Sequence, residues 1–357
     1  MTQDINKPIY TKLAGAAKLI ASTPTVRYIL RGEPGLGKTA LVYALQDLLG
    51  YPVARIDCAN LSLGDLAIPV PNHDNSTINW YHNARFKLQD GKPVIVVLDE
   101  FPKAGEEEMN MLHPLLEVND PRLGDVPVPE GSVIFLTGNM DSDGVGDELG
   151  EHTRQRLVEL IIQKPNAEEW LKWAAGNNIH PLVMAWVDRF PYALDSYLDG
   201  NVNEFNFDPT KPQRNVVSGR VLEIASRILH QRETINDDDA LLSALCGAGG
   251  RPFGESIMSF LAFNDAMPPF QSIVDDPTGT RIPAEAGARS VMVYGLVSRL
   301  TRDNFDAVMT YVKRFDESDP EWLMVFGLSV SHNPQVKDLG YNNGSYTSWL
   351  REHEDLL

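Results

Sequence analysis

A short apolar segment followed by a glycine-rich turn constrains this chain more than any other stretch. Residues 28–30 are apolar, and residues 32–39 read G-x-x-x-x-G-K-T before a helix-forming run. Glycines let backbone N–H groups face an anion without a Cβ in the way, and the helix that follows directs its positive end toward that anion. The pattern therefore predicts a phosphate-binding loop between a strand and a helix, rather than an ordinary glycine turn.

Side chains of this loop carry the predicted chemistry. Lys38 can reach the β- and γ-phosphates of a nucleoside triphosphate, and the Thr39 hydroxyl can bind Mg²⁺. The predicted nucleotide-binding residues are Gly32, Glu33, Pro34, Gly35, Leu36, Gly37, Lys38, Thr39 and Ala40.

A second motif follows roughly 60 residues after the loop. Residues 94–98 are apolar and predict a fully buried strand, which ends in Asp99 and Glu100. Parallel sheets bind ligands at the carboxyl edge of their strands. We expect Asp99 to support Mg²⁺ and Glu100 to orient and polarise the attacking water. The alternative, a strand that merely ends in solvated acidic residues, is weakened by the phosphate loop that precedes it.

Polar residues lie at the ends of two further predicted strands. Residues 133–139 predict a buried strand that ends in Asn139, which could lie beside the γ-phosphate and hydrogen-bond the water; a plain turn asparagine is the alternative. Arg154 and Arg156 precede a strand at residues 158–162. The pattern alone leaves open whether these arginines form a solvated helix face or reach a neighbouring subunit's γ-phosphate.

Composition limits the classes of partner. The chain has 357 residues and a formal net charge of −18, which argues against a whole-surface affinity for nucleic acid or anionic lipid. Cys58 and Cys246 are too few for a disulfide framework and are interpreted as packing residues, which favours a cytoplasmic setting. No run of about 18 apolar residues predicts a transmembrane helix, and residues 1–8 lack a signal-peptide pattern.

The order of the predicted elements gives an α/β fold. A helix at residues 8–22 precedes the first strand, and residues 53–57 predict a second strand after the helix that follows the phosphate loop. Turn residues between β-prone runs predict hairpins at 68–81 and 123–128. His73 and His82 lie in the first hairpin region without partner ligands at metal-site spacing, so we interpret them as solvated loop residues.

Helices dominate after residue 166. Asp237 to Asp239 are expected to cap a helix at 240–246, followed by a flexible break at 247–252, a surface connection at 264–288 and a partly ordered terminus at 333–357. Arg214 or Arg220 could contact the nucleotide from a lid or simply carry surface charge.

These motifs together resemble those of an AAA+ ATPase, in which they correspond to Walker A, Walker B, sensor 1 and the arginine finger. The chain resembles the MoxR branch, which carries hairpin insertions at the places that residues 67–81 and 122–128 occupy. The run Thr153-Arg154-Gln155-Arg156 is similar to that of the CbbQ/NorQ/GvpN-type subgroup. Arg156 matches the finger position better, and Arg154 is kept as a second candidate. Arg214 follows a Pro212-Gln213 pair that resembles the start of a sensor 2 helix.

The resemblance implies an AAA+ P-loop core with a five-stranded parallel sheet, an all-α lid and a helical C-terminal extension. The expected domains are an N-terminal helix at 1–23, the core at 24–164, the lid at 165–246 and the extension at 247–357. It further implies ATP and Mg²⁺ as cofactors, a homo-hexamer with nucleotide between subunits, and a bacterial or phage-encoded source. The sequence departs from the family pattern in two places, which are the Phe101-Pro102-Lys103 run after Walker B and a C-terminal region without matching motifs.

Three functions are compatible with these features. The leading hypothesis is an ATP-hydrolysing ring that remodels a protein partner, by family analogy a von Willebrand A-type protein. A nucleic-acid translocase or loader is the first alternative, but the hairpin at 68–81 contains neither Lys nor Arg, which disfavours it. The second alternative is an assembly scaffold in which nucleotide only stabilises the ring, and the intact Glu100 argues against it.

Overall fold

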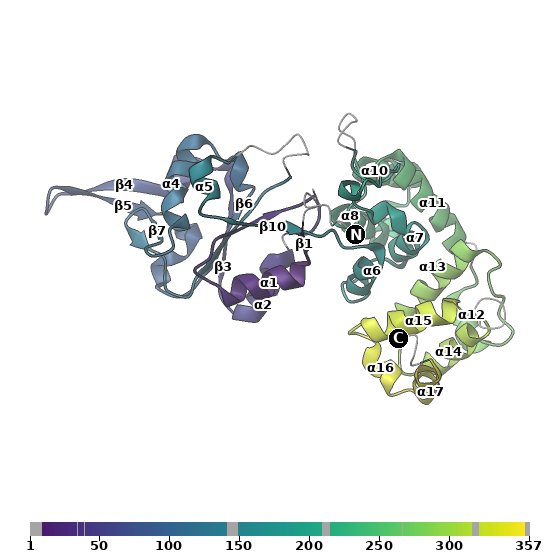
Figure 1. The fold of residues 1–357 in the computed structure, drawn as a ribbon. Coiled ribbons are helices and arrows are strands. Elements are labelled where there is room, and N and C mark those ends of the chain that lie inside the picture. Colours follow the sequence, from purple (N-terminus) through teal and green to yellow (C-terminus); the bar gives the residue numbers. More distant parts are fainter. Residues whose placement is uncertain are drawn as a thin grey trace, which may run out of the picture. The chain divides into compact units, whose positions relative to one another are not determined.

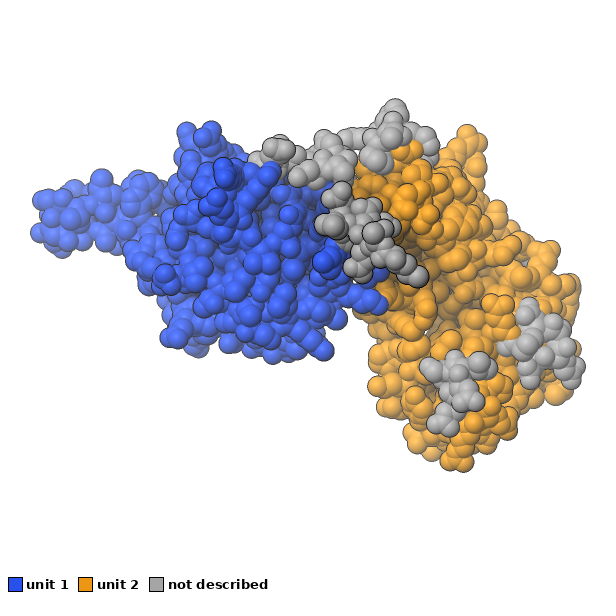
Figure 2. Space-filling model, viewed as in Figure 1, with its two compact units in different colours: residues 1–164 blue, residues 165–357 orange. Residues whose placement is uncertain are grey.

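The computed structural model describes residues 9–33, 35–38, 40–140, 149–208, 215–265, 267–315 and 321–353. The chain divides into two compact units, unit 1 at residues 1–164 and unit 2 at residues 165–357 (Figure 2). None of the helices in the described ranges is both long and apolar enough to cross a lipid bilayer.

A six-stranded parallel sheet forms the centre of unit 1 and confirms the predicted α/β core. Its spatial order is β1-β10-β2-β9-β6-β3. The strands are β1 (Tyr10–Thr11), β2 (Tyr28–Arg31), β3 (Val53–Asp57), β6 (Ile95–Asp99), β9 (Val133–Thr137) and β10 (Val158–Ile162). Five of them are the predicted strands, and β1 adds a sixth. The helix predicted from residue 8 begins only at Leu13, because residues 10 and 11 pair with β10 instead, and Ile9 is 88% exposed.

Helices cover both faces of this sheet. Alternate strand residues point to opposite faces, so each buried strand feeds two apolar clusters. Leu30, Val97 and Phe135 pack with α1 (Leu13–Ser22) and α2 (Ala40–Leu49). The residues that follow or precede them on the strands pack on the other face with α4 (Glu106–Leu116). The sheet is therefore held from both sides, which fixes the carboxyl ends of β2, β6 and β9 relative to one another.

Two hairpins extend from this core, as predicted. β4 (Ala67–Asn72) pairs with β5 (Thr77–His82), and β7 (Arg122–Leu123) pairs with β8 (Val126–Pro127). Figure 1 shows β4 and β5 reaching beyond the body of unit 1. The second hairpin supports the first, because the Trp80 N–H donates to the Asp125 carboxylate at 2.6 Å. Shorter helices of unit 1 are α3 (Leu63–Leu66) and α5 (Glu151–Arg154).

The regular secondary structure of unit 2 consists of helices alone in its described residues (Figure 1). Its helices are α6 (Ala167–Ala175), α7 (Pro181–Arg189), α8 (Gly219–His230), α9 (Arg232–Ile235), α10 (Asp238–Gly249), α11 (Arg251–Asp265), α12 (Phe270–Asp275), α13 (Ala286–Val297), α14 (Phe305–Lys313), α15 (Glu321–His332), α16 (Lys337–Tyr341) and α17 (Gly344–Glu352). Asp237 caps α10 as predicted, by accepting the Ala240 N–H at 3.0 Å.

The connection predicted at 264–288 joins α11 to α13 and contains the short helix α12. Two other expectations for unit 2 were wrong. The break predicted at 247–252 is a single residue between two helices, Gly250, whose φ of 90° suits glycine. The partly ordered terminus predicted from residue 333 forms α16 and α17, because Tyr346 and Trp349 are buried in an apolar cluster with α14 and α15. The domain boundary at residue 246 stays a prediction.

One histidine gives unit 2 a pH-dependent stability. Burial, followed by the nearby charges of His230, Arg232 and Arg299, lowers the pKa of His180 to about 4. The His180 and His230 rings lie 4.9 Å apart. Because the unfolded chain keeps the ordinary pKa of about 6.5, the unfolded state binds the proton more tightly. Folding stability from this group is present above pH 6.5 and falls as the pH approaches 4.

We expect the free energy of unfolding to drop between pH 7 and pH 4 by about 2–3 kcal/mol more in the wild type than in His180→Asn. Asparagine is a suitable replacement, because His180 caps α7 by accepting the Leu182 N–H on Nδ1 at 3.1 Å. Urea unfolding at a series of pH values measures this difference. Parallel curves for the two proteins would contradict the assignment.

Candidate functional site

The predicted phosphate loop connects the end of β2 to the start of α2. Gly35 and Gly37 have φ angles of 72° and 86°, which only glycine adopts readily. A Cβ on Gly32 would lie 3.0 Å from the Leu36 side chain and 3.3 Å from the Ile162 carbonyl oxygen, so the loop backbone approaches β10 closely. Pro34 and Thr39 lie outside the described residues, as does the side chain of Ala40.

The Lys38 ammonium is held by oxygen atoms of two segments. Its Nζ donates to the Gly32 carbonyl at 3.0 Å, to the Gly138 carbonyl at 2.8 Å and to Asn139 Oδ1 at 3.0 Å. The structure thus brings together the predicted phosphate-binding lysine and the predicted water-positioning asparagine. An ammonium donates three hydrogen bonds, so a phosphate oxygen that bound Lys38 would replace one of these acceptors.

The two carboxylates after β6 lie at the same edge of the sheet. Asp99 Oδ1 accepts from the Thr137 hydroxyl, and Oδ2 accepts from Arg55 Nε at 3.0 Å and forms an ion pair with the same guanidinium. Burial alone would raise the pKa of Asp99, but the hydrogen bonds from Thr137 and Arg55 and the charges of Arg55 and Lys38 lower it below its ordinary value. An ionised carboxylate that already accepts a cation fits the requirements of a Mg²⁺ site.

Glu100 follows Asp99 in a left-handed backbone conformation, with φ of 52° and ψ of 39°. This conformation is unfavourable for a residue with a Cβ, and such strain occurs often at functional sites. The Glu100 N–H donates to the Thr137 hydroxyl oxygen at 3.0 Å. Lys103 Nζ donates to Glu100 Oε2 at 2.6 Å. One threonine hydroxyl therefore holds both residues of the motif.

Arg31 positions the segment after β9. It is only 5% exposed, and its Nη1 donates to the Asn139 carbonyl at 2.7 Å. A Cβ on Gly138 would lie 3.0 Å from this same Nη1, so the guanidinium packs directly against the backbone. Arg31 and Lys38 thus fix the main chain and the side chain of Asn139, respectively.

A buried ion pair constrains the predicted phosphate loop. Glu33 is 3% exposed, and its Oε2 lies 3.3 Å from Lys164 Nζ, whose side chain is 10% exposed. Lys164 is the last residue of unit 1. Removing one member of such a pair leaves an uncompensated buried charge, so the pair constrains the loop conformation.

The two candidate finger arginines lie on the surface of unit 1. Both are exposed, at the end of α5 and just beyond it. Arg156 donates to Glu117 Oε1 at 3.1 Å and to the His152 carbonyl at 2.7 Å, which are not predicted nucleotide-binding groups. His113 in α4 contacts the Thr153 hydroxyl at 2.8 Å and joins α4 to α5. Arg214 lies outside the described residues.

The described residues contain no group of three or more His, Cys, Asp or Glu side chains that could hold a metal ion. His82 instead contacts Gln89 Oε1 at 3.4 Å. Cys58 is buried, and its pKa is raised to about 12 by burial and by the charges of Asp99 and Asp57, which agrees with a packing role.

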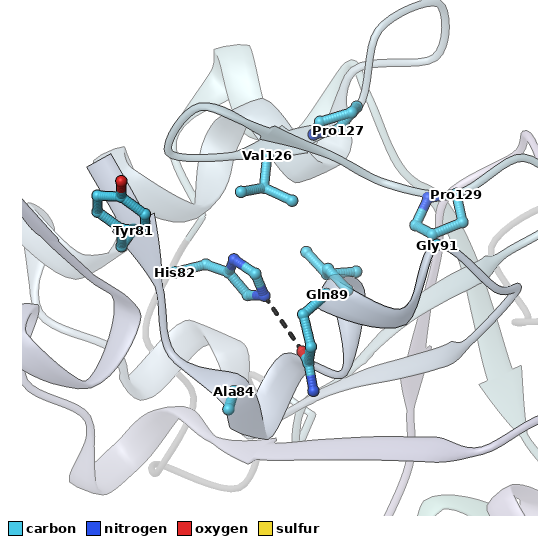
Figure 3. A pocket seen from close by; sticks show the side chains of 9 residues that line it. Tyr81, His82, Ala84, Gln89, Gly91, Val126, Pro127 and Pro129 are labelled. Carbon is cyan, nitrogen blue, oxygen red and sulfur yellow. Dashed lines mark hydrogen bonds between the residues drawn. The ribbon is translucent and has the colours of Figure 1, made fainter. Parts of the chain in front are cut away.

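A pocket of about 520 Å³ lies where the two hairpins meet the core (Figure 3). Its lining is uncharged and contains none of the predicted nucleotide-binding residues. It consists of Tyr81, His82, Ala84, Leu88, Gln89, Gly91, Val126, Pro127 and Pro129.

Four polar partners in the site were missed by sequence reasoning. Arg55, Lys103 and Thr137 contact the two carboxylates, and Arg31 contacts Asn139. Thr137 alone gave a usable signal, as a polar residue that ends an otherwise apolar strand predicted to lie in the same sheet.

One family match covers the segment that contains Lys38, Asp99, Glu100 and Asn139. Residues 28–163 match the family described as ATPase family associated with various cellular activities (AAA). Midasin of Giardia intestinalis is 27% identical over 187 residues, which are 49% of this chain and 4% of Midasin, so the chain spans a small fraction of that relative.

Solved structures to which this chain is similar include those of two further proteins. The RuvB Holliday junction branch migration motor of Thermotoga maritima is 14% identical, with 78% of this chain and 80% of that chain covered and a TM-score of 0.35. Hsp104 of S. cerevisiae, in a complex with casein, is 16% identical, with 44% and 33% covered and a TM-score of 0.31.

Proposed function

We propose that this chain, whose residues 28–163 match the AAA ATPase family, binds ATP with Mg²⁺, hydrolyses it and uses the cycle to remodel a protein partner. The observation that carries the proposal is the joint placement of Lys38, Asn139, Asp99 and Glu100. Hydrogen bonds of Lys38 and Thr137 join the loop, the end of β6 and the end of β9.

Each residue has a distinct role in this proposal. Lys38 binds the β- and γ-phosphates, and Asn139 Oδ1, which lies 3.0 Å from Lys38 Nζ, orients the attacking water. Glu100 accepts a proton from that water as it attacks. Asp99, with Thr39, would hold Mg²⁺, which would neutralise charge on the phosphates.

The other proposed elements come from outside this cluster. Arg156 of a neighbouring copy stabilises charge on the γ-phosphate, and Arg154 is the second candidate. The exposure of both arginines and the weak surface pair of Arg156 with Glu117 support this role. Arg214 senses nucleotide from the lid. The assembly is a homo-hexamer of the MoxR type in the CbbQ/NorQ/GvpN-like subgroup, and both hairpins support the assignment to this branch.

The client-binding surface in this proposal is the hairpin β4–β5. Its strands expose large apolar side chains, which is unusual for a surface with no function. They are Ile68, Val70, Ile78, Trp80 and Tyr81. The hairpin contains no Lys or Arg, and the pocket at its base is uncharged, so it suits an uncharged or apolar protein segment better than a phosphate backbone. The proposed client is a von Willebrand A-type protein.

Loss of the Lys38 ammonium tests nucleotide binding. We expect Lys38→Ala to weaken ATP binding about 10- to 100-fold, because a charge-assisted hydrogen bond to phosphate contributes about 1.5–3 kcal/mol. Calorimetric titration with ATP and Mg²⁺ measures the change. Lys92→Ala, at an exposed position of unit 1, is the control and should bind like the wild type. The proposal fails if the wild type does not bind ATP.

A further inference from the structure

Arg55 is a cation at the candidate site that none of the sequence motifs includes. It lies in β3, the strand next to β6, and its Nε donates to Asp99 Oδ2 at 3.0 Å while a second guanidinium nitrogen pairs with the same oxygen. The Thr137 hydroxyl donates a hydrogen bond to the other carboxylate oxygen, Asp99 Oδ1. A carboxylate offers about four lone-pair sites, so these three hydrogen bonds leave about one for a further ligand.

The strand register explains why Asp99 needs a positive partner. β3 and β6 are parallel, and Asp57 lies directly opposite Asp99. Like charges at opposite positions destabilise a sheet. Asp57 uses its oxygens locally, accepting from the Ala59 N–H at 3.2 Å and from Asn60 Nδ2 at 2.8 Å. Arg55 lies two residues before Asp57 on the same face of β3, from which its long side chain reaches Asp99.

Resting on the proposed function, we infer that Arg55 is a positioning residue that neutralises Asp99 in the nucleotide-free chain and so lowers the dependence of ATP binding on Mg²⁺. A Mg²⁺ ion held by Asp99 would compete with the Arg55 guanidinium for the same carboxylate oxygens. In the absence of Mg²⁺, Arg55 shields the triphosphate from the charges of Asp99 and Asp57. Bound Mg²⁺ would supply that shielding, so Arg55 would contribute little to affinity in its presence.

The test is the ratio of two dissociation constants for a fluorescent non-hydrolysable ATP analogue, measured in EDTA and in excess Mg²⁺. We expect Arg55→Gln to raise this ratio about three- to tenfold over the wild type, from weaker binding in EDTA, since partly exposed charge pairs have energies of about this size. Affinity in Mg²⁺ should change less than about twofold. Arg55→Lys keeps the charge and should keep the wild-type ratio.

A matched control separates this effect from a general loss of charge. Arg85 is also in unit 1, its side chain is 46% exposed like that of Arg55, and it pairs with Asp65 at 2.7 Å. Arg85→Gln removes the same charge from an aspartate that is not a predicted site residue and should leave the ratio unchanged. Arg55→Met is prepared alongside Arg55→Gln, so that either soluble neutral variant decides the question, and thermal unfolding checks that the variants are folded.

The possible results test the proposed function and the role of Arg55 separately. A wild type that binds the analogue in neither condition overturns the proposed function. A wild type that binds, with an equal ratio in the wild type and the neutral Arg55 variants, overturns only the role of Arg55. An equal rise in Arg85→Gln also overturns that role, because the effect would then reflect net charge.

Discussion

Replacing Glu100 by glutamine is expected to lower ATP turnover by about 10²- to 10⁴-fold, the usual contribution of a general base. Glutamine keeps the size of the side chain but cannot accept a proton from water. The fold should persist, because the lost ion pair with Lys103 is partly exposed and such pairs contribute at most about 1 kcal/mol. Steady-state phosphate release measures the loss, and ATP affinity should stay within about threefold of the wild type.

The control for this variant is the same substitution on an exposed residue of unit 1. Glu107→Gln, in the first turn of α4, should leave turnover unchanged. Phosphate release by Glu100→Gln at the wild-type rate would show that another group activates the water.

The same variant distinguishes a remodelling enzyme from a scaffold. A ring that holds ATP without hydrolysing it should retain its client, so a pull-down with Glu100→Gln in ATP is expected to enrich the client relative to the wild type. If the variant assembles with the client and supports the same client activity as the wild type, that activity does not require ATP hydrolysis. The scaffold hypothesis would then be favoured over the remodelling hypothesis. Salt-sensitive retention of single-stranded DNA would instead favour the translocase.

Replacing Arg156 by alanine is expected to reduce turnover by about 10³- to 10⁵-fold, the range for an arginine that stabilises phosphoryl transfer from a neighbouring subunit. In the described chain, Arg156 pairs with Glu117, but both side chains are largely exposed, at 39% and 51%. Such a pair is worth at most about 1 kcal/mol, so the guanidinium can leave it to reach a phosphate. Nucleotide affinity and assembly should change little by comparison.

Arg154→Ala is the matched variant, two residues away and also exposed. We expect it to keep turnover within about threefold of the wild type, and a loss confined to Arg154→Ala would move the assignment to that residue. Mixing provides a second test. Subunits with Arg156→Ala retain an intact phosphate loop, and subunits with Lys38→Ala retain an intact arginine. Mixed rings should recover activity only if Arg156 acts across a subunit interface.

The sequence predicted those elements whose apolar and turn residues lie within the element itself or directly beside it. β3 and β10 were predicted residue for residue, since both are bounded by turn or polar residues. Both hairpins were predicted from turn residues between β-prone runs. β1 could not be predicted in this way, because its two residues are ordered by pairing with Ile161 and Ile162, about 150 residues later. α17 depends on the burial of Tyr346 and Trp349 in a cluster formed by distant helices.

The residues of the candidate site also fall into two groups, those that local motifs identify and those that only the fold brings together. Lys38, Asp99 and Glu100 belong to contiguous motifs, so their types and spacing suffice to identify them. Arg55 and Thr137 act on Asp99 from two other strands, one on each side of β6. Their contacts follow from strand order and register, which a single sequence does not state. The corrections in unit 2 have a similar cause, since helix ends there depend on packing rather than on strong breakers.

The Thr137 hydroxyl accepts the Glu100 N–H and donates to Asp99, and Asn139 follows two residues later on the same segment. A displacement at the end of β9 would therefore reach Asp99, Glu100 and Asn139 together. The three roles proposed for these residues depend on one segment of backbone, so a backbone movement would not change one role without the others. Rate adjustments in this protein would have to come from side chains such as Lys103, which contact one member of the trio alone.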